Sequence, residues 1–183
     1  METKEEKMKQ GVTHIRPGDG RSLRVLGEVV TYKITSERTG GAYSLFEVVS
    51  EPGGGPPPHV QHREDEAFYV LEGEYEFLDD DGHTIRLGTG SLVYVPKGNL
   101  HAHKDVGDKP ARMLVSQTPG GLHERFLEEL GEPATDGATP PVPEGPPELG
   151  RIAAVAMKYG TEIPPSPEGG RRNETRQKGG DHR

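Results

Sequence analysis

Short runs in which apolar and polar residues alternate occupy the central part of this chain. Alternation places the apolar side chains on one face of an extended strand, so each run predicts a half-buried β-strand. The runs are separated by stretches rich in turn-forming Gly, Pro, Asn and Asp, such as SERTGGA, EPGGGPPP, DDDGH, LGTG and PKGN. The predicted strands span residues 23–26, 29–34, 43–49, 67–71, 74–78, 84–87, 91–95 and 112–116. Many short strands at this spacing indicate an all-β sandwich or barrel.

Two later segments follow a helical period instead. In GLHERFLEELG the leucines and Phe126 fall on one helical face, and Gly131 is placed to end the helix. We expect this helix to cap the barrel or to contribute to an interface. In ELGRIAAVAMKYG the pattern predicts a second, weakly amphipathic helix that Gly160 ends.

The length of 183 residues suits one domain with a single core. Proline-rich and polar stretches then mark the ends of that domain. We predict the following organisation: a disordered N-terminus at 1–11, a barrel with its capping helix at 12–131, a Pro-rich linker at 132–147, a short C-terminal helix at 148–163, and a disordered tail at 164–183.

Charge and composition exclude several classes of partner. The formal net charge is -8, and no basic stripe is interleaved with aromatic residues, which argues against nucleic acid. No apolar stretch is long enough to span a membrane, and the start METKEEKMKQG lacks the apolar block of a secretory signal. Cysteine is absent, which excludes disulfides and thiolate ligands. We therefore expect a soluble cytoplasmic protein that binds neither nucleic acid nor membrane.

Side chains that bind metals gather behind two tight turns. His59 and Glu66 follow the Gly/Pro turn in GGGPPPHVQHREDE, and His101 follows the turn in VPKGNLH. Imidazole nitrogens and carboxylate oxygens suit borderline divalent metals. The pattern therefore predicts a metal site.

The spacing of these residues resembles the two motifs of the cupin family. The first motif runs Gly53, five residues, His59, one residue, Gln61, four residues, Glu66, six residues, Gly73. The second runs Gly90, five residues, Pro96, one residue, Gly98, two residues, His101, with Asp105 in the place of a closing Asn. The resemblance covers residues 40–120, with weaker support back to residue 12. It implies a cupin-type double-stranded β-helix, or jelly-roll barrel, with one or two C-terminal helices.

The resemblance also implies a set of metal ligands, carried over position by position as His59, Gln61, Glu66 and His101. These would hold one divalent transition metal per chain, chosen from iron, nickel, copper, cobalt, manganese and zinc. Gln61 departs from the family, which has histidine there, and a neutral amide oxygen is a weaker ligand than imidazole. The identity of the metal is therefore left open.

The alternation of side chains along a strand predicts which way the other histidines near the motifs face. Consecutive side chains of a strand face opposite sides, so His62 is expected to point outward unless a bulge reverses it. The first motif changes parity between His59 and Glu66, which requires a kink or an extra residue.

His103 shares parity with His101 and is expected to face the same interior. It is either a pocket residue, a partner or substitute in the ligand set, or a histidine that only packs and forms hydrogen bonds. His14, His83 and His123 have no partner at ligand spacing, and we expect them to be solvated.

Among cupins, PPPHVQHREDEAFYVLEGEYEF and LVYVPKGNLHAHKDVGDKPARMLV look most like the small bacterial proteins similar to quercetin 2,3-dioxygenase. That resemblance implies an oxygenase whose small-molecule substrate is an enolisable phenol such as a flavonol. Glu66 and His103 are its catalytic candidates, with Glu66 both binding the metal and accepting the substrate proton. Two alternatives stay open: a Lewis-acid isomerase or cyclase, and a non-catalytic small-molecule-binding or regulatory cupin, which Gln61 favours. The family also implies a homodimer.

Overall fold

Burial alternates along the strands as the sequence pattern predicts. In β3 (Ser44–Ser50) every second residue is buried, and β10 (Ala111–Thr118) repeats this pattern against it. This computed structural model describes residues 11–134 and 149–165. The predicted disordered ends and most of the predicted linker lie outside these residues, except for Gly11 and a few residues at the linker and tail boundaries.

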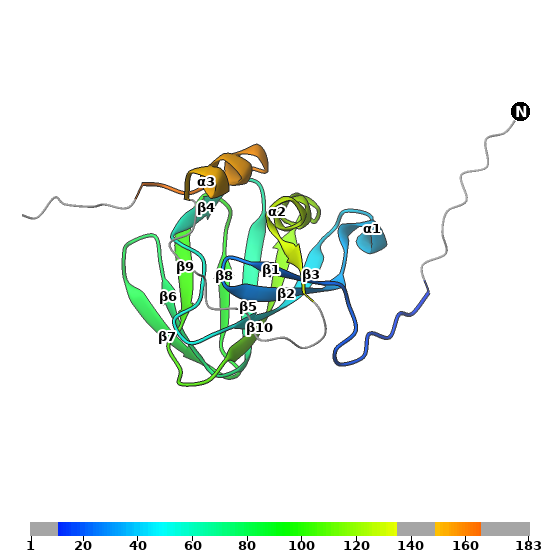
Figure 1. Cartoon of the computed structure of the whole chain (residues 1–183), viewed down its shortest axis with the longest axis horizontal. Coiled ribbons are helices and arrows are strands. Elements are labelled where there is room, and N and C mark those ends of the chain that lie inside the picture. Colours follow the sequence, from blue (N-terminus) through cyan, green and yellow to red (C-terminus); the bar gives the residue numbers. More distant parts are fainter. Residues whose placement is uncertain (1–10, 135–148, 166–183) are drawn as a thin grey trace, which may run out of the picture.

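The described residues form two antiparallel sheets that face each other (Figure 1). One sheet has the order β11-β1-β2-β3-β10-β5-β8 and the other β12-β4-β9-β6-β7. The remaining strands are β1 (Ser22–Val25), β2 (Glu28–Ile34), β4 (His59–Gln61), β5 (Asp65–Glu72), β6 (Glu74–Leu78), β7 (Thr84–Gly88), β8 (Leu92–Val95), β9 (Leu100–Asp105), β11 (Glu132–Pro133) and β12 (Thr161–Glu162). The architecture is the predicted all-β double-stranded β-helix.

Each predicted run overlaps an observed strand, and four strands lie outside the runs: β4, β9, β11 and β12. A short helix, α1 (Ser36–Thr39), occupies part of the stretch predicted as a turn, and Gly40 ends it at a φ of 64°. β11 falls at the start of the predicted linker, where it pairs with β1. α1, β4, β11 and β12 are too short for a periodic pattern to appear in them. β9 is longer, but its inward residues are His101, His103 and Asp105, so it lacks the apolar alternation that marks a strand.

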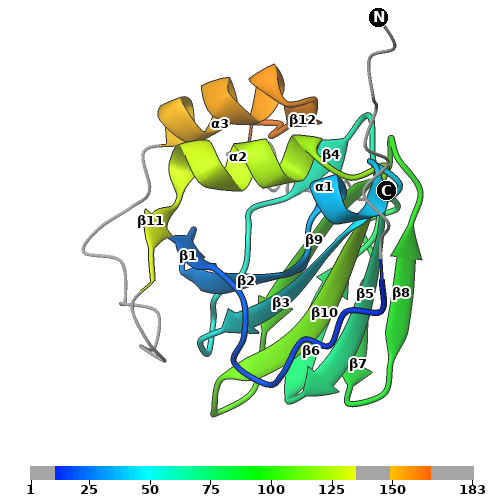
Figure 2. The same cartoon turned by 90° about the vertical axis from the view of Figure 1, so that its right-hand side faces the viewer.

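Two helices cover one end of the barrel. α2 (Leu122–Leu130) and α3 (Leu149–Lys158) lie side by side across that end, next to β4 (Figure 2). Phe126 and Leu127 of α2 are buried in the barrel core, which confirms α2 as a capping helix. No helix in the two described ranges is long and apolar enough to cross a membrane.

The first motif changes sheets midway. β4 belongs to the smaller sheet and β5 to the larger one, so the chain bends between Gln61 and Asp65. This bend is the change of parity that the spacing of His59 and Glu66 requires. It confirms that side chains from opposite walls of the barrel can reach one interior point.

The turn ahead of β4 is packed tightly against β9. Gly55 has a φ of 145°, and a Cβ atom there would lie 2.0 Å from the carbonyl oxygen of His103. Asp105 closes the other end of β9, because its two carboxylate oxygens accept hydrogen bonds from the backbone N–H groups of Gly107 (2.8 Å) and Ala111 (3.0 Å). The backbone on both sides of the two histidine strands is thus fixed.

Gly55→Ala is expected to destabilise the barrel by about 3 kcal/mol, through the contact with the His103 carbonyl and the strained φ. For a chain of this size that is a fall in Tm of roughly 6–12 °C. Gly88→Ala is the matched control, since a Cβ atom at Gly88 meets nothing within 4 Å. Thermal denaturation of both variants checks this, and equal melting temperatures would show that the turn has room to shift.

Candidate metal centre

Two strands of the smaller sheet bring the motif histidines together. β4 and β9 are antiparallel, and their register places His59 directly opposite His101. Residues opposite each other in such a pair project their side chains to the same face. The two imidazole rings accordingly lie with centroids 4.3 Å apart.

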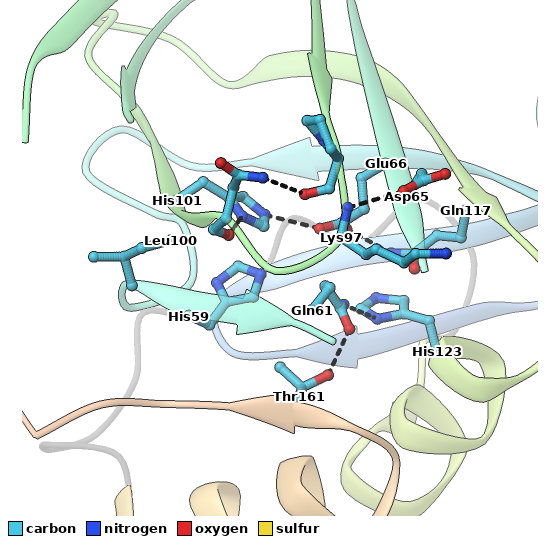
Figure 3. A network of polar contacts seen from close by, with 12 residues as sticks. His59, Gln61, Asp65, Glu66, Lys97, Leu100, His101, Gln117, His123 and Thr161 are labelled. Atoms are coloured by element: carbon cyan, nitrogen blue, oxygen red, sulfur yellow. Dashed lines mark hydrogen bonds and ion pairs between the residues drawn. The ribbon is translucent and has the colours of Figure 1, made fainter. Parts of the chain in front are cut away.

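Glu66 reaches the same point from β5 in the facing sheet (Figure 3). Its Oε2 lies 2.8 Å from Nε2 of His101. One potential ligand atom from each of His59, Glu66 and His101 lies within 4.8 Å of the other two. The exposed fractions of these residues are only 8%, 3% and 1%. Three of the four predicted ligands therefore converge.

Backbone carbonyls fix the tautomers of both histidines. Nδ1 of His59 lies 2.9 Å from the carbonyl oxygen of Pro57, and Nδ1 of His101 lies 3.2 Å from that of Asn99. A carbonyl oxygen only accepts, so each Nδ1 carries the proton and donates it. Each neutral ring is then left with its Nε2 lone pair, which is the form of histidine that binds a metal.

Glu66 is oriented in the same manner. The Gln117 side chain lies opposite it in the register of β5 and β10, and its Nε2 donates to Oε1 of Glu66 over 2.7 Å. Oε2 is thereby left facing Nε2 of His101. Both atoms are buried, and neither has a hydrogen-bond partner of good geometry, despite the 2.8 Å between them.

Two lone pairs at this distance repel unless a cation, either a proton on Nε2 of His101 or a metal ion, lies between or beside them. Ligand atoms bound about 2.1 Å from one metal are themselves about 3 Å apart at right angles, so the observed spacing suits a shared metal. The donor set of two imidazoles and one carboxylate suits a borderline transition metal. These residues therefore fit the divalent metal that the cupin resemblance implies.

The electrostatics of Glu66 and His59 favour the forms that ligate a metal, whereas His101 is drawn toward protonation by Glu66. Burial opposes ionisation of Glu66, but His101 and His59 outweigh it and hold the pKa of Glu66 below its ordinary value. Burial and the positive charge of His101 lower the pKa of His59 to about 4. For His101, burial acts downward, but the Glu66 carboxylate prevails and raises its pKa. A carboxylate and a neutral imidazole are the forms that ligate metals, so a bound metal would take the place of the proton that Glu66 favours on His101.

Gln61, the fourth predicted ligand, shares the inward face with His59, but both ends of its amide have protein partners. Its Oε1 accepts a hydrogen bond from Oγ1 of Thr161 (2.6 Å), and its Nε2 lies 3.1 Å from Nδ1 of His123 (Figure 3). Coordination by Gln61 stays a prediction, and it would require the contact with Thr161 to be shared or broken.

His103 faces the interior, as its parity predicts, but belongs to a second polar cluster. Its Nε2 lies 2.9 Å from Oε1 of Glu28, which also accepts from the hydroxyl of Ser50 (2.5 Å). The hydroxyl of Tyr75 donates to Ser50 in turn (3.2 Å). The ring of Phe68 lies 5.8 Å from that of His101 and 5.7 Å from that of His103. A catalytic role for His103 stays a prediction.

His62 points outward, as predicted from parity. Half of its side chain is exposed, and its Nε2 pairs with Glu162 of β12 at 2.9 Å. It therefore contacts the C-terminal segment and is not among the three converging side chains.

The expectation that His123 is solvated is wrong. His123 lines the interior cavity, and its ring packs against those of Phe46 and Phe126. Burial lowers its pKa. The signal lay in the helical period, because residue 123 precedes Phe126 and Leu127 by three and four positions and so shares their buried face.

Glu64 is a further buried residue that the sequence analysis did not single out. Only 1% of it is exposed, and its Oε1 accepts a hydrogen bond from the backbone N–H of His123 over 3.2 Å. Burial raises the pKa of this carboxyl to about 7. Glu64 thus ties the bend after β4 to the first turn of α2.

The cavity beside the three converging residues is small and mainly apolar. Its volume is about 70 Å³, which is room for roughly five water molecules. Apolar walls come from Phe46, Val48, Phe68 and Leu127, while Thr161 and Ile163 contribute from the C-terminal segment. The metal centre therefore opens into a pocket that α2 and the C-terminal segment help to enclose.

Curated relatives share part of this chain. Germin-like protein subfamily 2 member 1 of Arabidopsis thaliana is 37% identical over 108 residues, which are 55% of this chain and 46% of that protein. Dimethylsulfoniopropionate lyase DddQ of Ruegeria pomeroyi is 40% identical over 68 residues, 37% of this chain and 33% of the lyase. The chain spans about half the length, or less, of these relatives.

Solved structures share the fold. The polyketide cyclase RemF from Streptomyces resistomycificus has a TM-score of 0.52 and 23% identity, covering 59% of this chain and 80% of its own. A predicted oxalate decarboxylase from Thermotoga maritima has a TM-score of 0.53 and 18% identity, covering 58% and 99%. Residues 46–116 match the family model described as the cupin domain. Residues 46–116 thus form a cupin domain, in which both histidine motifs meet inside a double-stranded β-helix.

Proposed function

We propose that this protein is a metal-dependent cupin enzyme in which His59, Glu66 and His101 hold one divalent transition metal. The observation that carries the proposal is the pair of buried acceptor atoms, Oε2 of Glu66 and Nε2 of His101, 2.8 Å apart without a hydrogen bond of good geometry. Such an arrangement is costly to bury unless a cation is shared between the two atoms.

The charge of the site indicates which substrates it would take. Two neutral imidazoles and one carboxylate leave a divalent metal with a net positive charge, in a cavity of mainly apolar walls. Such a metal, when bound, supplies Lewis-acid polarisation of an oxygen ligand. We infer that the substrate is a small molecule bound through an anionic oxygen of an enolate or a carboxylate.

The residues of the chain would do the remaining work. Gln117 holds Oε1 of Glu66 and so keeps the carboxylate pointing to the metal position. Phe68 and the other apolar walls exclude water, which strengthens every electrostatic interaction inside the cavity. Glu66 and His103 both line this cavity, and their assignment as catalytic residues is part of the proposal.

Two reaction classes fit such a site. The resemblance of the two motif segments to quercetin 2,3-dioxygenase-like proteins, which rests on the sequence alone, favours an oxygenase acting on an enolisable phenol such as a flavonol. The cavity favours a smaller substrate, because its volume of about 70 Å³ is well below the roughly 300–1,000 Å³ of usual ligand pockets. This second observation supports Lewis-acid chemistry on a small acid, and it makes an isomerase, cyclase or lyase the second candidate.

Metal binding is expected to need His59, Glu66 and His101 and not His62. Wild-type protein supplied with Co²⁺ or Ni²⁺ should retain about one ion per chain and melt several degrees higher. His101→Ala and Glu66→Gln should each weaken metal affinity by about 100-fold or more, since each removes a ligand. Elemental analysis and thermal denaturation measure both effects.

His62→Ala is the matched control, because His62 is half exposed and pairs with Glu162. Loss of metal from His62→Ala alone would contradict the ligand set. A wild type that retains no ion and gains no stability from any divalent metal would favour the non-catalytic binding module. Gln61→Leu tests the fourth predicted ligand, and a loss as large as that of His101→Ala would assign Gln61 to the metal.

The oxygenase hypothesis is tested by oxygen consumption. The protein is loaded with metal anaerobically, mixed with 3-hydroxyflavone and then exposed to oxygen. The amount of oxygen consumed should be proportional to the amount of flavonol added. Glu66→Gln should reduce the rate at least 100-fold, since it loses the carboxylate that binds the metal. An oxygen electrode gives the rate. Retained metal without any oxygen uptake would contradict the oxygenase and leave Lewis-acid chemistry.

A further inference from the structure

His123 reaches the cavity from α2, outside both cupin motifs. Its ring is held between Phe46 and Phe126, with ring centroids 5.8 Å and 5.4 Å away, and it lines the same cavity as His59 and Glu66. Figure 3 shows the ring beside Gln61, on the side of the site where Gln117 lies.

The backbone that carries His123 is tied to three other elements. The buried carboxylate of Glu64 accepts from the N–H of His123. The next residue, Glu124, accepts hydrogen bonds from the backbone N–H and hydroxyl of Ser36 and from the hydroxyl of Ser44. These hydrogen bonds fix the first turn of α2, so the His123 side chain is held in place before a ligand binds. Binding sites require such preorganisation.

A chain of hydrogen bonds sets the tautomer of His123. The hydroxyl of Thr161 donates to Oε1 of Gln61, so the amide NH₂ of Gln61 is the end that faces Nδ1 of His123. An amide NH₂ only donates, so Nδ1 must accept, and the neutral ring carries its proton on Nε2. Within residues 11–134 and 149–165, no acceptor is paired with this N–H, and Nε2 is not among the fully buried unpaired atoms. It is therefore open to a ligand.

We propose that His123 binds the substrate by donating its Nε2–H to a second oxygen of the metal-bound anion. This inference rests on the proposed metal function and narrows its substrate class to small acids that carry another acceptor oxygen besides the one on the metal. A donor fixed in an apolar cavity favours an anionic oxygen strongly, because little water competes with it. Thr161 helps to set the tautomer of this donor through its hydrogen bond to Gln61, so the C-terminal segment helps to complete the binding site.

The test uses two probes that differ only in the second acceptor. Malonate has a carboxylate where propionate has a methyl group. Their binding to the full-length Co²⁺-loaded protein is followed by the visible absorption of the metal. His123→Phe keeps an aromatic ring between Phe46 and Phe126 and removes the donor. We expect it to weaken malonate binding about 10- to 100-fold, as for a hydrogen bond to a charged group, and to change propionate binding less than twofold.

Two control variants accompany it. His123→Gln, which can place an N–H at similar reach, should recover malonate affinity to within about threefold of the wild type. His14→Phe changes an exposed histidine that belongs to neither group of potential metal ligands and should leave both affinities unchanged. All three variants should keep wild-type Co²⁺ affinity, because none removes a ligand.

The outcomes separate this inference from the proposed function. A wild type that binds no Co²⁺ overturns both. If His123→Phe binds Co²⁺ normally and its malonate affinity equals that of the wild type, only the role of His123 is overturned. If His123→Phe loses Co²⁺, His123 is a metal ligand instead. Should that variant fail to fold, ¹⁵N shifts of His123 in the wild type decide: an Nε2–H tautomer whose resonance moves with malonate supports the role, and an Nδ1–H tautomer or an unmoved resonance refutes it.

Discussion

The apposition of Glu66 and His101 is the constraint on which the interior of this barrel depends. Two acceptor atoms, 2.8 Å apart, are held there by neighbouring groups: the carbonyl of Asn99 fixes the His101 tautomer, and Gln117 donates to the other oxygen of Glu66. An apolar core of the same size would be easier to fold, because buried charges lose their hydration. The barrel instead keeps a position in which a cation relieves the repulsion.

Closure of the cavity depends on segments beyond the barrel motifs. α2 supplies Phe126 and Leu127 to the cavity wall, and β12 adds Thr161 beside Gln61. Gln61, which departs from the family ligand pattern, thus joins the barrel to the C-terminal segment. In this structure Gln61 orients neighbouring groups through both ends of its amide, which gives the departure a physical role apart from metal binding.

The sequence predicted the barrel, the capping helix and the convergence of His59, Glu66 and His101, because strand alternation and motif spacing are local signals that tertiary packing reinforces. It did not predict β4 or β12, which are too short to show a period. The role of Gln61 also escaped prediction, because its partners Thr161 and His123 lie 100 and 62 residues away. The burial of His123 could have been predicted, since its position three residues before Phe126 places it on the buried face of α2.

Anomalous diffraction at the cobalt edge, from a crystal of the protein soaked with Co²⁺, would locate the metal. We expect one strong peak per chain, about 2.0–2.2 Å from Nε2 of His59, Nε2 of His101 and Oε2 of Glu66. A map without a peak between these atoms would contradict this expectation. So would a peak only at Asp79, Asp81 and His83, whose ligand atoms also lie within 4.8 Å of one another.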